Sequence, residues 1–204
     1  MGAIMSAAHE YELDEQYEWP RPPQGGWTAD DLDRLPNLPP HTELIDGSLV
    51  LVSPQAAFHA RVMKLLQIAL ENQAPVESEV LPEMSIRLDE KNQLEPDVLV
   101  TRTYEFLDAY QTWYGPQQIL LAVEVVSPDS KERDREVKPR KYAGVGIPHF
   151  WRVEEDGGLP IVYVYELDPA AKAYQPTGIY HDKLRLTVPF PIEIDLTAIN
   201  RRRP

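Results

Sequence analysis

Two acidic residues, Asp97 and Glu124, stand in stretches that are otherwise strongly apolar. Glu124 lies in the sequence LLAVEVV, and Asp97 lies in EPDVLV. An ionised carboxylate buried alone costs more free energy than one domain can spare, so each side chain needs a cation, a hydrogen-bond network or a proton. If the two stretches are paired strands, both carboxylates can bind one hard cation, Mg²⁺ or Mn²⁺, with the carbonyl oxygen of Val125 as a third ligand. Such an ion would neutralise the buried charge and activate water for hydrolysis.

Each of the two acids also has a simpler interpretation. Glu124 could face solvent at the edge of a sheet, and Asp97 could begin a strand or form a turn beside Pro96. One shared cation explains both acids together, because magnesium is usually held by one or two carboxylates plus water and substrate phosphate. The pair therefore indicates a divalent-metal site.

The segment that follows Glu124 supplies cations. Between residues 131 and 141 there are six Lys or Arg residues against three acids. The usual explanation of such a run is a solvent-exposed charged helix face. Pro139 suits the first position of a helix, so Lys138 is expected at the helix entrance, where it could orient or deprotonate the attacking water or stabilise charge on the phosphate. The candidate phosphate contacts in this segment are Arg133, Arg135 and Arg140.

The elements that must position these residues alternate in type, which predicts a mixed α/β domain around one sheet. The strongest strand predictions are residues 94–101 and 119–126, and the second is so apolar that we expect burial on both faces. Residues 58–72 predict one long helix that covers a face of the sheet. Shorter predicted elements are a hairpin at 43–54 that turns at Asp46-Gly47, helices at 27–35, 139–144 and within 104–114, and strands at 76–81, 84–88, 149–153 and 161–167.

Composition limits the partners of this domain. The chain has 204 residues, 43% of them hydrophobic, which suits one domain, predicted at 26–200, after an acidic and proline-rich tail at 1–25. The net charge of −13 argues against a broad surface that binds nucleic acid, because binding phosphate requires Lys and Arg. Any contact with nucleic acid must therefore be local or assisted by a metal ion. The absence of cysteine excludes disulfides, thiolate catalysis and zinc–thiolate sites. No apolar run reaches the roughly 20 residues of a membrane helix, and the N-terminus does not resemble a secretory signal, so we expect a cytoplasmic protein.

Several stretches resemble the Uma2-like restriction endonuclease family, a branch of the PD-(D/E)xK nuclease superfamily. They lie within residues 42–167 and are ELIDGSLVLVSP, Phe58-His59 at the start of a helix, EPDVLV, LLAVEVVSPDS and DREVKPRKYAGVGIPHFWRVE. Each stretch is weak evidence alone, but this order and spacing rarely arise by chance. The resemblance implies the restriction-endonuclease-like fold, which is a central mixed sheet flanked by helices, and metal-dependent cleavage of phosphodiester bonds.

The resemblance also implies roles for individual residues. Asp97 corresponds to the aspartate of the PD motif and Glu124 to the (D/E) position, while Val126 stands where the lysine of the motif is expected. Lys138 matches a lysine that this family carries in the following segment, and Lys141 is the alternative donor.

Two further positions match the family with less specific signals. Glu43 could hold the metal through a water molecule or support its ligands, but a glutamate at the end of a hairpin is equally expected on structural grounds. His59 could contact substrate, although a lone histidine at a helix start is more often a cap or a surface residue. Tyr142, Pro148 and Trp151 also match and are interpreted as packing residues.

Two functions are consistent with these features. The first is a DNA endonuclease dependent on Mg²⁺ or Mn²⁺, expected as a homodimer because cutting two strands favours two sites, with aromatic residues around Trp113 as a candidate interface. The second is a non-catalytic module that keeps the nuclease fold to bind a nucleic acid or a protein, which the acidic charge and the displaced lysine favour. A small-molecule enzyme has little support, since the sequence has no glycine-rich phosphate loop, G-x-S-x-G motif or metal-spaced histidine pair.

Overall fold

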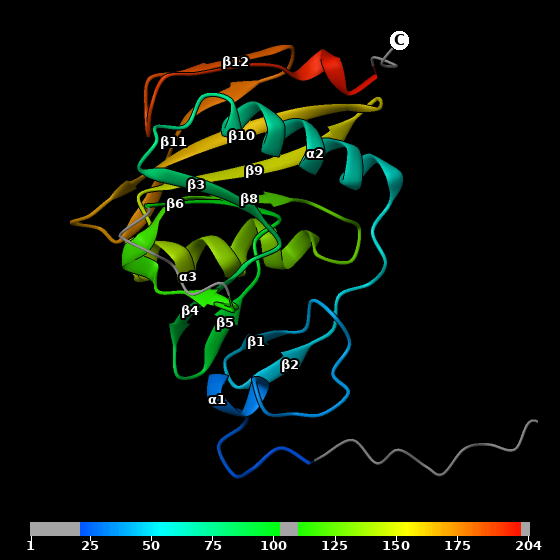
Figure 1. Ribbon diagram of the computed structural model, residues 1–204, viewed down its shortest axis with the longest axis vertical. Helices are drawn as coiled ribbons and strands as arrows, with labels where there is room; N and C mark the ends of the chain where they lie inside the picture. Colours follow the sequence, from blue (N-terminus) through cyan, green and yellow to red (C-terminus); the bar gives the residue numbers. More distant parts are fainter. Residues whose placement is uncertain (1–20, 103–109, 201–204) are drawn as a thin grey trace, which may run out of the picture.

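A six-stranded mixed sheet forms the centre of the fold in the computed structural model, which describes residues 21–102 and 110–200 (Figure 1). In sheet order the strands are β11 (Ala173–Tyr180), β10 (Leu159–Asp168), β9 (His149–Asp156), β8 (Ile119–Val125), β6 (Val98–Arg102) and β3 (Ser78–Pro82). Neighbours are antiparallel except β8 and β9, which are parallel. A parallel pair needs a crossover connection, and here the crossover contains the helical segment after Glu124.

A smaller five-stranded sheet lies beside the first. Its strands, in order, are β2 (Ser48–Val50), β1 (Glu43–Ile45), β5 (Asn92–Leu94), β4 (Ser85–Asp89) and β7 (Trp113–Tyr114). The predicted hairpin of β1 and β2 is confirmed, and its turn residues Asp46 and Gly47 have φ angles of 50° and 75°. Positive φ at both turn residues is what the two-residue hairpin turn with the matching twist requires. The remaining short elements are β12 (Lys183–Leu186), paired with β13 (Ile192–Asp195), and the 3₁₀ helices η1 (Pro116–Gln118) and η3 (Leu196–Asn200).

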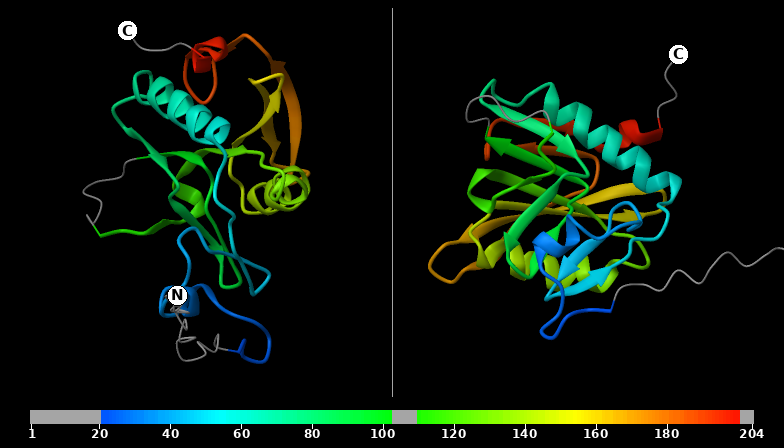
Figure 2. Two further views of the ribbon diagram at one scale, coloured as in Figure 1. Left: turned by 90° about the vertical axis from the view of Figure 1, so that its right-hand side faces the viewer. Right: turned by 60° about the horizontal axis from the view of Figure 1, so that its bottom comes forward.

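Two helices cover opposite faces of the central sheet (Figure 2). The helix α2 (Ala57–Glu71) contributes Leu66 and Leu70 to a core that also contains Val123 of β8. The helix α3 (Lys138–Gly144) contributes Tyr142 to a second core, which contains Ala122. Because side chains alternate along a strand, β8 supplies both cores, and the predicted burial of both its faces is confirmed. A fully buried leucine stabilises the fold by about 1.5–3 kcal/mol relative to an exposed one.

The helix predicted at 27–35 is shorter than expected. It forms α1 (Ala29–Leu32), where Thr28 and Asp31 make a reciprocal capping box. The Thr28 hydroxyl accepts from the Asp31 amide at 3.1 Å, and the Asp31 carboxylate accepts from the Thr28 amide at 2.9 Å. Thr28 is therefore the N-cap of this helix, which ends after one turn.

The predicted start of a helix at Pro139 is wrong. Helical structure begins at Lys131, passes through a π-helical turn η2 (Arg133–Val137) and continues into α3, so Lys138 lies inside a continuous helix and not at its entrance. A proline has no amide hydrogen to donate, and its ring crowds the preceding turn. The wider π turn immediately before Pro139 accommodates both effects, and such turns are frequent at functional sites.

Some predictions fall outside the described residues. The tail predicted at 1–25 lies mostly within 1–20, and the helix predicted within 104–114 falls largely on 103–109, so both stay predictions. Of the helices in the described part of the chain, none combines the length and apolarity that crossing a membrane requires.

Candidate active site

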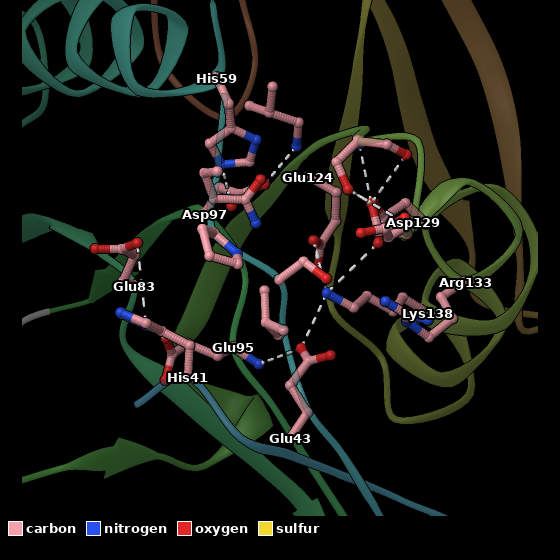
Figure 3. Close-up of a pocket in the computed structure, with 18 of the residues that line it drawn as sticks. His41, Glu43, His59, Glu83, Glu95, Asp97, Glu124, Asp129, Arg133 and Lys138 are labelled. Atoms are coloured by element: carbon pink, nitrogen blue, oxygen red, sulfur yellow. Dashed lines mark hydrogen bonds and ion pairs between the residues drawn. The ribbon is translucent and has the colours of Figure 1, made fainter. Parts of the chain in front are cut away.

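A cavity of about 430 Å³ lies where the two sheets and the helical crossover meet (Figure 3). Its walls come from β1, the loop before α2, the start of β6, the end of β8 and the η2–α3 helix. Seven of the residues singled out in the sequence line it, and they are Glu43, His59, Asp97, Glu124, Val125, Arg133 and Lys138. Tertiary folding therefore gathers residues that are up to 95 positions apart in the chain.

Asp97 stands immediately before β6, and both of its carboxylate oxygens accept hydrogen bonds. Nε2 of His59 donates to Oδ1 at 2.8 Å, and the amide nitrogen of Val125 donates to Oδ2 at 2.5 Å. Because Val98 pairs with Val123, the next position outward in this antiparallel register sets Asp97 beside Glu124. The two acids therefore lie on one wall of the same cavity, as the shared-cation hypothesis requires.

Glu124 lies near the end of β8 with a side chain that is only 2% exposed. Its Oε1 accepts a 2.6 Å hydrogen bond from the hydroxyl of Tyr142, and its Oε2 accepts a 2.8 Å bond from Nζ of Lys138. Burial raises the pKa of Glu124 well above its usual range, and the positive charge of Lys138 opposes that rise. The carboxylate is thus held in place by two buried donors on the same helix.

Lys138 points into the acidic part of the cavity (Figure 3). Its Nζ lies 2.9 Å from Oε1 of Glu43, 2.8 Å from Oε2 of Glu124 and 3.5 Å from Oδ1 of Asp134. Burial alone would lower the pKa of Lys138, but the surrounding carboxylates raise it well above its usual value. The side chain is therefore a buried ammonium ion that holds acids from β1, β8 and the helix together.

Glu43 is placed by the pairing of the smaller sheet. Besides the contact with Lys138, its Oε1 accepts a 2.9 Å hydrogen bond from the amide nitrogen of Glu95, which follows β5. Since Glu43 is only 2% exposed, the hairpin-end glutamate faces the cavity and not solvent. The smaller sheet therefore contributes a carboxylate to the site.

The basic residues after Glu124 divide between two sides of the helix. Arg133 lines the cavity, and its Nε is buried with no hydrogen-bond partner among the described residues. Arg135 pairs with Glu154 and Arg140 pairs with Glu136, and neither arginine lines the cavity. Of the three candidate phosphate contacts, only Arg133 faces this cavity. Arg135, two residues on, projects to another side of the helix, and the π turn η2 rotates Arg140 away from the face that a regular α-helix would give a residue seven positions beyond Arg133.

Lys141, the alternative to Lys138, also points elsewhere. Its Nζ lies 2.7 Å from Oδ1 of Asp46 in the hairpin turn, and it does not line the cavity. Trp113, named as part of a candidate dimer interface, is half-buried, and the guanidinium of Arg87 lies 4.3 Å from its ring centroid.

Two residues of the site were missed or misread in the sequence. Asp134 is buried, and its pKa is raised by burial and lowered by Lys138, its neighbour four residues along the helix. The hydroxyl group of Ser130 donates a hydrogen bond to the carboxylate of Asp134. The spacing of Asp134 and Lys138 was the available signal, since residues four apart share a helix face. Tyr142 was interpreted as packing, but its hydroxyl bonds Glu124, and no sequence pattern distinguishes a buried tyrosine that has such a partner from one that has none.

A second group at the cavity rim was not anticipated. The Nδ1 atom of His41 contacts the carboxylate of Glu95 and lies 4.0 Å from Oε1 of Glu83. The hydrogen bond to Glu95 raises the pKa of His41, and burial raises the pKa of Glu95. These residues make the rim acidic as well as the interior.

The chemistry of the donors suits a hard divalent cation. Seven carboxylates line the cavity against two permanent cations, Arg133 and Lys138, so the cavity carries an excess of negative charge. Oxygen donors of this kind are what Mg²⁺ prefers, and each carboxylate oxygen can accept more than one contact. Within residues 21–102 and 110–200, no three His, Asp or Glu side chains converge as a ready-made ligand set. A bound ion would therefore need water and substrate oxygens beside Asp97, Glu124 and the Val125 carbonyl.

Comparisons with known proteins agree with this architecture. The profile of the Uma2 family, described as "Putative restriction endonuclease", matches residues 29–198. A crystal structure from Anabaena variabilis, of "a putative nuclease belonging to DUF820", matches with a TM-score of 0.66 at 15% identity, over 84% of this chain and 96% of that chain. Such identity supports the fold alone, and it confirms the expected restriction-endonuclease-like class. A search of curated proteins finds no match. Because the family match extends over most of its 204 residues, the chain belongs to the Uma2 family of putative restriction endonucleases.

Proposed function

We propose that this chain is a DNA endonuclease that depends on Mg²⁺ or Mn²⁺ and hydrolyses phosphodiester bonds in the cavity. The observation that carries the proposal is that Asp97 and Glu124, from neighbouring strands, face one cavity together with the buried ammonium ion of Lys138. Asp97, Glu124 and the Val125 carbonyl would hold the ion. When bound, a divalent cation polarises the phosphodiester and lowers the pKa of a bound water molecule.

The residues around the ion have distinct parts in this proposal. The oxygen of a water molecule bonds to phosphorus, one P–O ester bond breaks, and the proton that the water loses is balanced by the proton that the departing oxygen gains. Lys138 stays protonated because its pKa is raised, so it acts as a hydrogen-bond donor and a positive charge toward the phosphate and not as the base. Glu43 keeps Lys138 in position through their 2.9 Å contact.

Two side chains of the cavity are proposed to contact substrate. Arg133 has a buried Nε with no partner in the described part of the chain, and a phosphate oxygen would satisfy it. His59 is buried and keeps Asp97 oriented through their 2.8 Å hydrogen bond, and it lies at the cavity wall, where substrate would pass. Arg135, Arg140 and Lys141 are not assigned to this contact, because they point away from the cavity.

The test is cleavage of supercoiled plasmid with Mg²⁺, Mn²⁺ or EDTA. We expect nicking that requires the divalent ion, and Asp97→Asn and Glu124→Gln should each reduce the rate by at least about 100-fold, the upper end of what loss of a ligand's supporting partner costs. Glu71→Gln is the matched control, because Glu71 is an exposed acid at the end of α2, outside the cavity, that accepts a hydrogen bond from Gln67. Cleavage that survives both cavity substitutions would refute the proposal.

A non-catalytic module that binds a nucleic acid or a protein is the second candidate. All four carboxylate oxygens of Asp97 and Glu124 already accept hydrogen bonds from protein donors. The two acids therefore have partners without a metal ion, which favours this candidate. Titration calorimetry with Mn²⁺ distinguishes the two candidates. Binding lost in Asp97→Asn supports the enzyme, whereas no heat in the wild-type protein supports the module.

The assembly and the location of the enzyme are further parts of the proposal. We propose a homodimer, because each chain has one active site and cutting both strands of a duplex requires two. Light scattering at high concentration tests the oligomeric state. A mass equal to one 23.3 kDa chain would contradict a homodimer. We also propose a cytoplasmic location, where a DNA substrate is present, and fluorescence microscopy of a tagged chain would test it.

A further inference from the structure

A second pocket, of about 270 Å³, lies on another side of the η2–α3 helix. It shares no lining residue with the cavity, since Arg133, Asp134 and Lys138 face the cavity while Arg135 and Arg140 face this pocket. Its floor is aromatic and comes from β9, β10 and β11, with Phe150, Tyr165 and Tyr174. We call it the α3 pocket.

The charge of the α3 pocket is opposite to that of the rest of the protein. Four cations line it, Arg135, Arg140, Arg152 and Lys172, against one lining carboxylate, Glu136. Among residues 21–102 and 110–200, one further acid, Glu154, forms ion pairs with these cations, and it pairs with both Arg135 and Arg152. In a chain with a net charge of −13, this is a local excess of positive charge.

The cations of the α3 pocket are partly fixed in advance. The guanidinium of Arg152 lies 2.8 Å from Glu154 and 4.5 Å from the ring centroid of Tyr163. The rings below are themselves packed, with Phe150 stacked on Tyr174 at 5.4 Å between centroids. A guanidinium held between a carboxylate and aromatic faces loses little freedom when an anion binds it.

Two cations at the rim remain accessible. The side chain of Arg140 is 79% exposed and has a 2.6 Å contact with Glu136, its helix neighbour. Lys172 lies in the turn between β10 and β11, is exposed, and has no ion pair with any residue that the structure describes. The partly buried ion pairs with Glu154 account for Arg135 and Arg152 without a ligand, but they do not account for Lys172 or for the excess of cations.

We propose that the α3 pocket binds a phosphate group of DNA outside the cavity. Guanidinium groups match phosphate in geometry, and lysine contributes a point charge. The identity of the ligand rests on the proposed function, because a DNA endonuclease must also contact DNA beyond the cleaved bond. The α3 pocket is the place that we infer for this contact. It also explains how an acidic protein holds a polyanion, because the affinity comes from a local basic site that is separate from the acidic cavity.

The test measures binding without cleavage, so its failure and the failure of the proposed nuclease are distinguishable. The wild-type protein, the double variant Arg140→Glu/Lys172→Glu and a matched control are titrated into a short fluorescent DNA duplex in EDTA, and anisotropy is followed at several salt concentrations. The control is Lys183→Glu/Arg185→Glu on β12, which also reverses one exposed lysine and one arginine that pairs with a glutamate, Glu193, at 3.0 Å. Both doubles change the net charge equally.

We expect the α3-pocket variant to bind about tenfold or more weakly, since hydrogen bonds to charged groups contribute factors of this size. Its salt slope should also fall by about 0.9 for each phosphate contact that is lost. The control should keep most of the wild-type affinity. Equal loss in both doubles, or a wild-type protein that binds no duplex, would overturn the proposal. Calorimetry with inorganic phosphate distinguishes a DNA phosphate from free phosphate as the ligand. A pocket that binds free phosphate but not the duplex would also overturn the proposal.

Discussion

The hydroxyl group of Tyr142 donates a 2.6 Å hydrogen bond to Oε1 of Glu124, and both side chains are buried. Burial raises the pKa of Tyr142 well above its usual value, and the adjacent carboxylate raises it further, so the hydroxyl stays a donor. The other oxygen of Glu124 accepts from Lys138, one helical turn earlier. A single helix therefore fixes both oxygens of the carboxylate that we propose as a metal ligand.

Replacing Tyr142 with phenylalanine removes one of these two donors. We expect about a 10–100-fold loss of divalent-ion affinity or of cleavage rate, which is typical when the partner of a ligand is removed. The free energy of unfolding should fall by about 1–3 kcal/mol, because Glu124 keeps a buried oxygen without its donor. Mn²⁺ titration and plasmid cleavage measure the first effect, and urea unfolding measures the second.

Tyr114→Phe is the matched control for this prediction. Tyr114 is also buried, and a carboxylate outside the cavity, that of Glu79, contributes to raising its pKa. Burial raises the pKa of Tyr114 to about 12. This substitution should affect stability only. Equal loss of activity in both variants would mean that Tyr142 acts through the general stability of the fold.

Replacing Lys138 with methionine should be strongly destabilising. It leaves Glu43 and Glu124 buried without their common cation, and removal of one partner of a buried ion pair costs about 3–5 kcal/mol. We also expect cleavage to be abolished. Urea unfolding reports the first effect, and a variant as stable as the wild type would show that the acids are neutral in the folded protein.

Lys141→Met provides the comparison. Lys141 contacts Asp46, whose side chain is 74% exposed, so the pair should contribute no more than about 1 kcal/mol. Activity should be kept, since Lys141 lies outside the cavity. Loss of cleavage in this variant with retained stability would instead favour Lys141 as the catalytic lysine.

His149, at the start of β9, should make stability depend on pH. Burial lowers its pKa below the usual value of 6.5, and Glu166 opposes that shift. The unfolded chain therefore binds the proton more readily, so the free energy of unfolding should fall as the pH drops through the unfolded pKa and level off below the folded pKa. In His149→Gln this part of the decrease between about pH 7.5 and 5.5 should disappear. Urea unfolding of the wild type and the variant at both pH values tests this prediction. If the free energy of unfolding falls by the same amount between the two pH values in both proteins, the prediction is wrong.

Two glycines should respond in opposite ways to alanine. Gly26 has a φ of 79°, and an added Cβ would lie 2.7 Å from the carbonyl oxygen of Gly47, so Gly26→Ala should cost at least about 1 kcal/mol. Gly144 lies in α3 with open space around it, so Gly144→Ala should stabilise by about 0.4–1 kcal/mol. Thermal unfolding of the two variants measures both. A stabilised Gly26→Ala would mean that the hairpin turn can move away.

The sequence by itself located the main strands and the long helix and marked the two candidate acids. Periodicity located β8 and α2, the Asp46-Gly47 turn located the hairpin, and an acid inside an apolar strand marked Asp97 and Glu124, because these signals depend on neighbours along the chain. The order of motifs identified the family.

Only the tertiary structure decided which side chains meet. The register of β6 and β8 set Asp97 beside Glu124, and the π turn before Pro139 directed Asp134 and Lys138 into the cavity while Arg135 and Arg140 faced the α3 pocket. Tyr142 became a hydrogen-bond donor because α3 packs against the end of β8. Contacts between distant segments depend on strand register and helix rotation, and neither is encoded in the spacing of residues within a single segment.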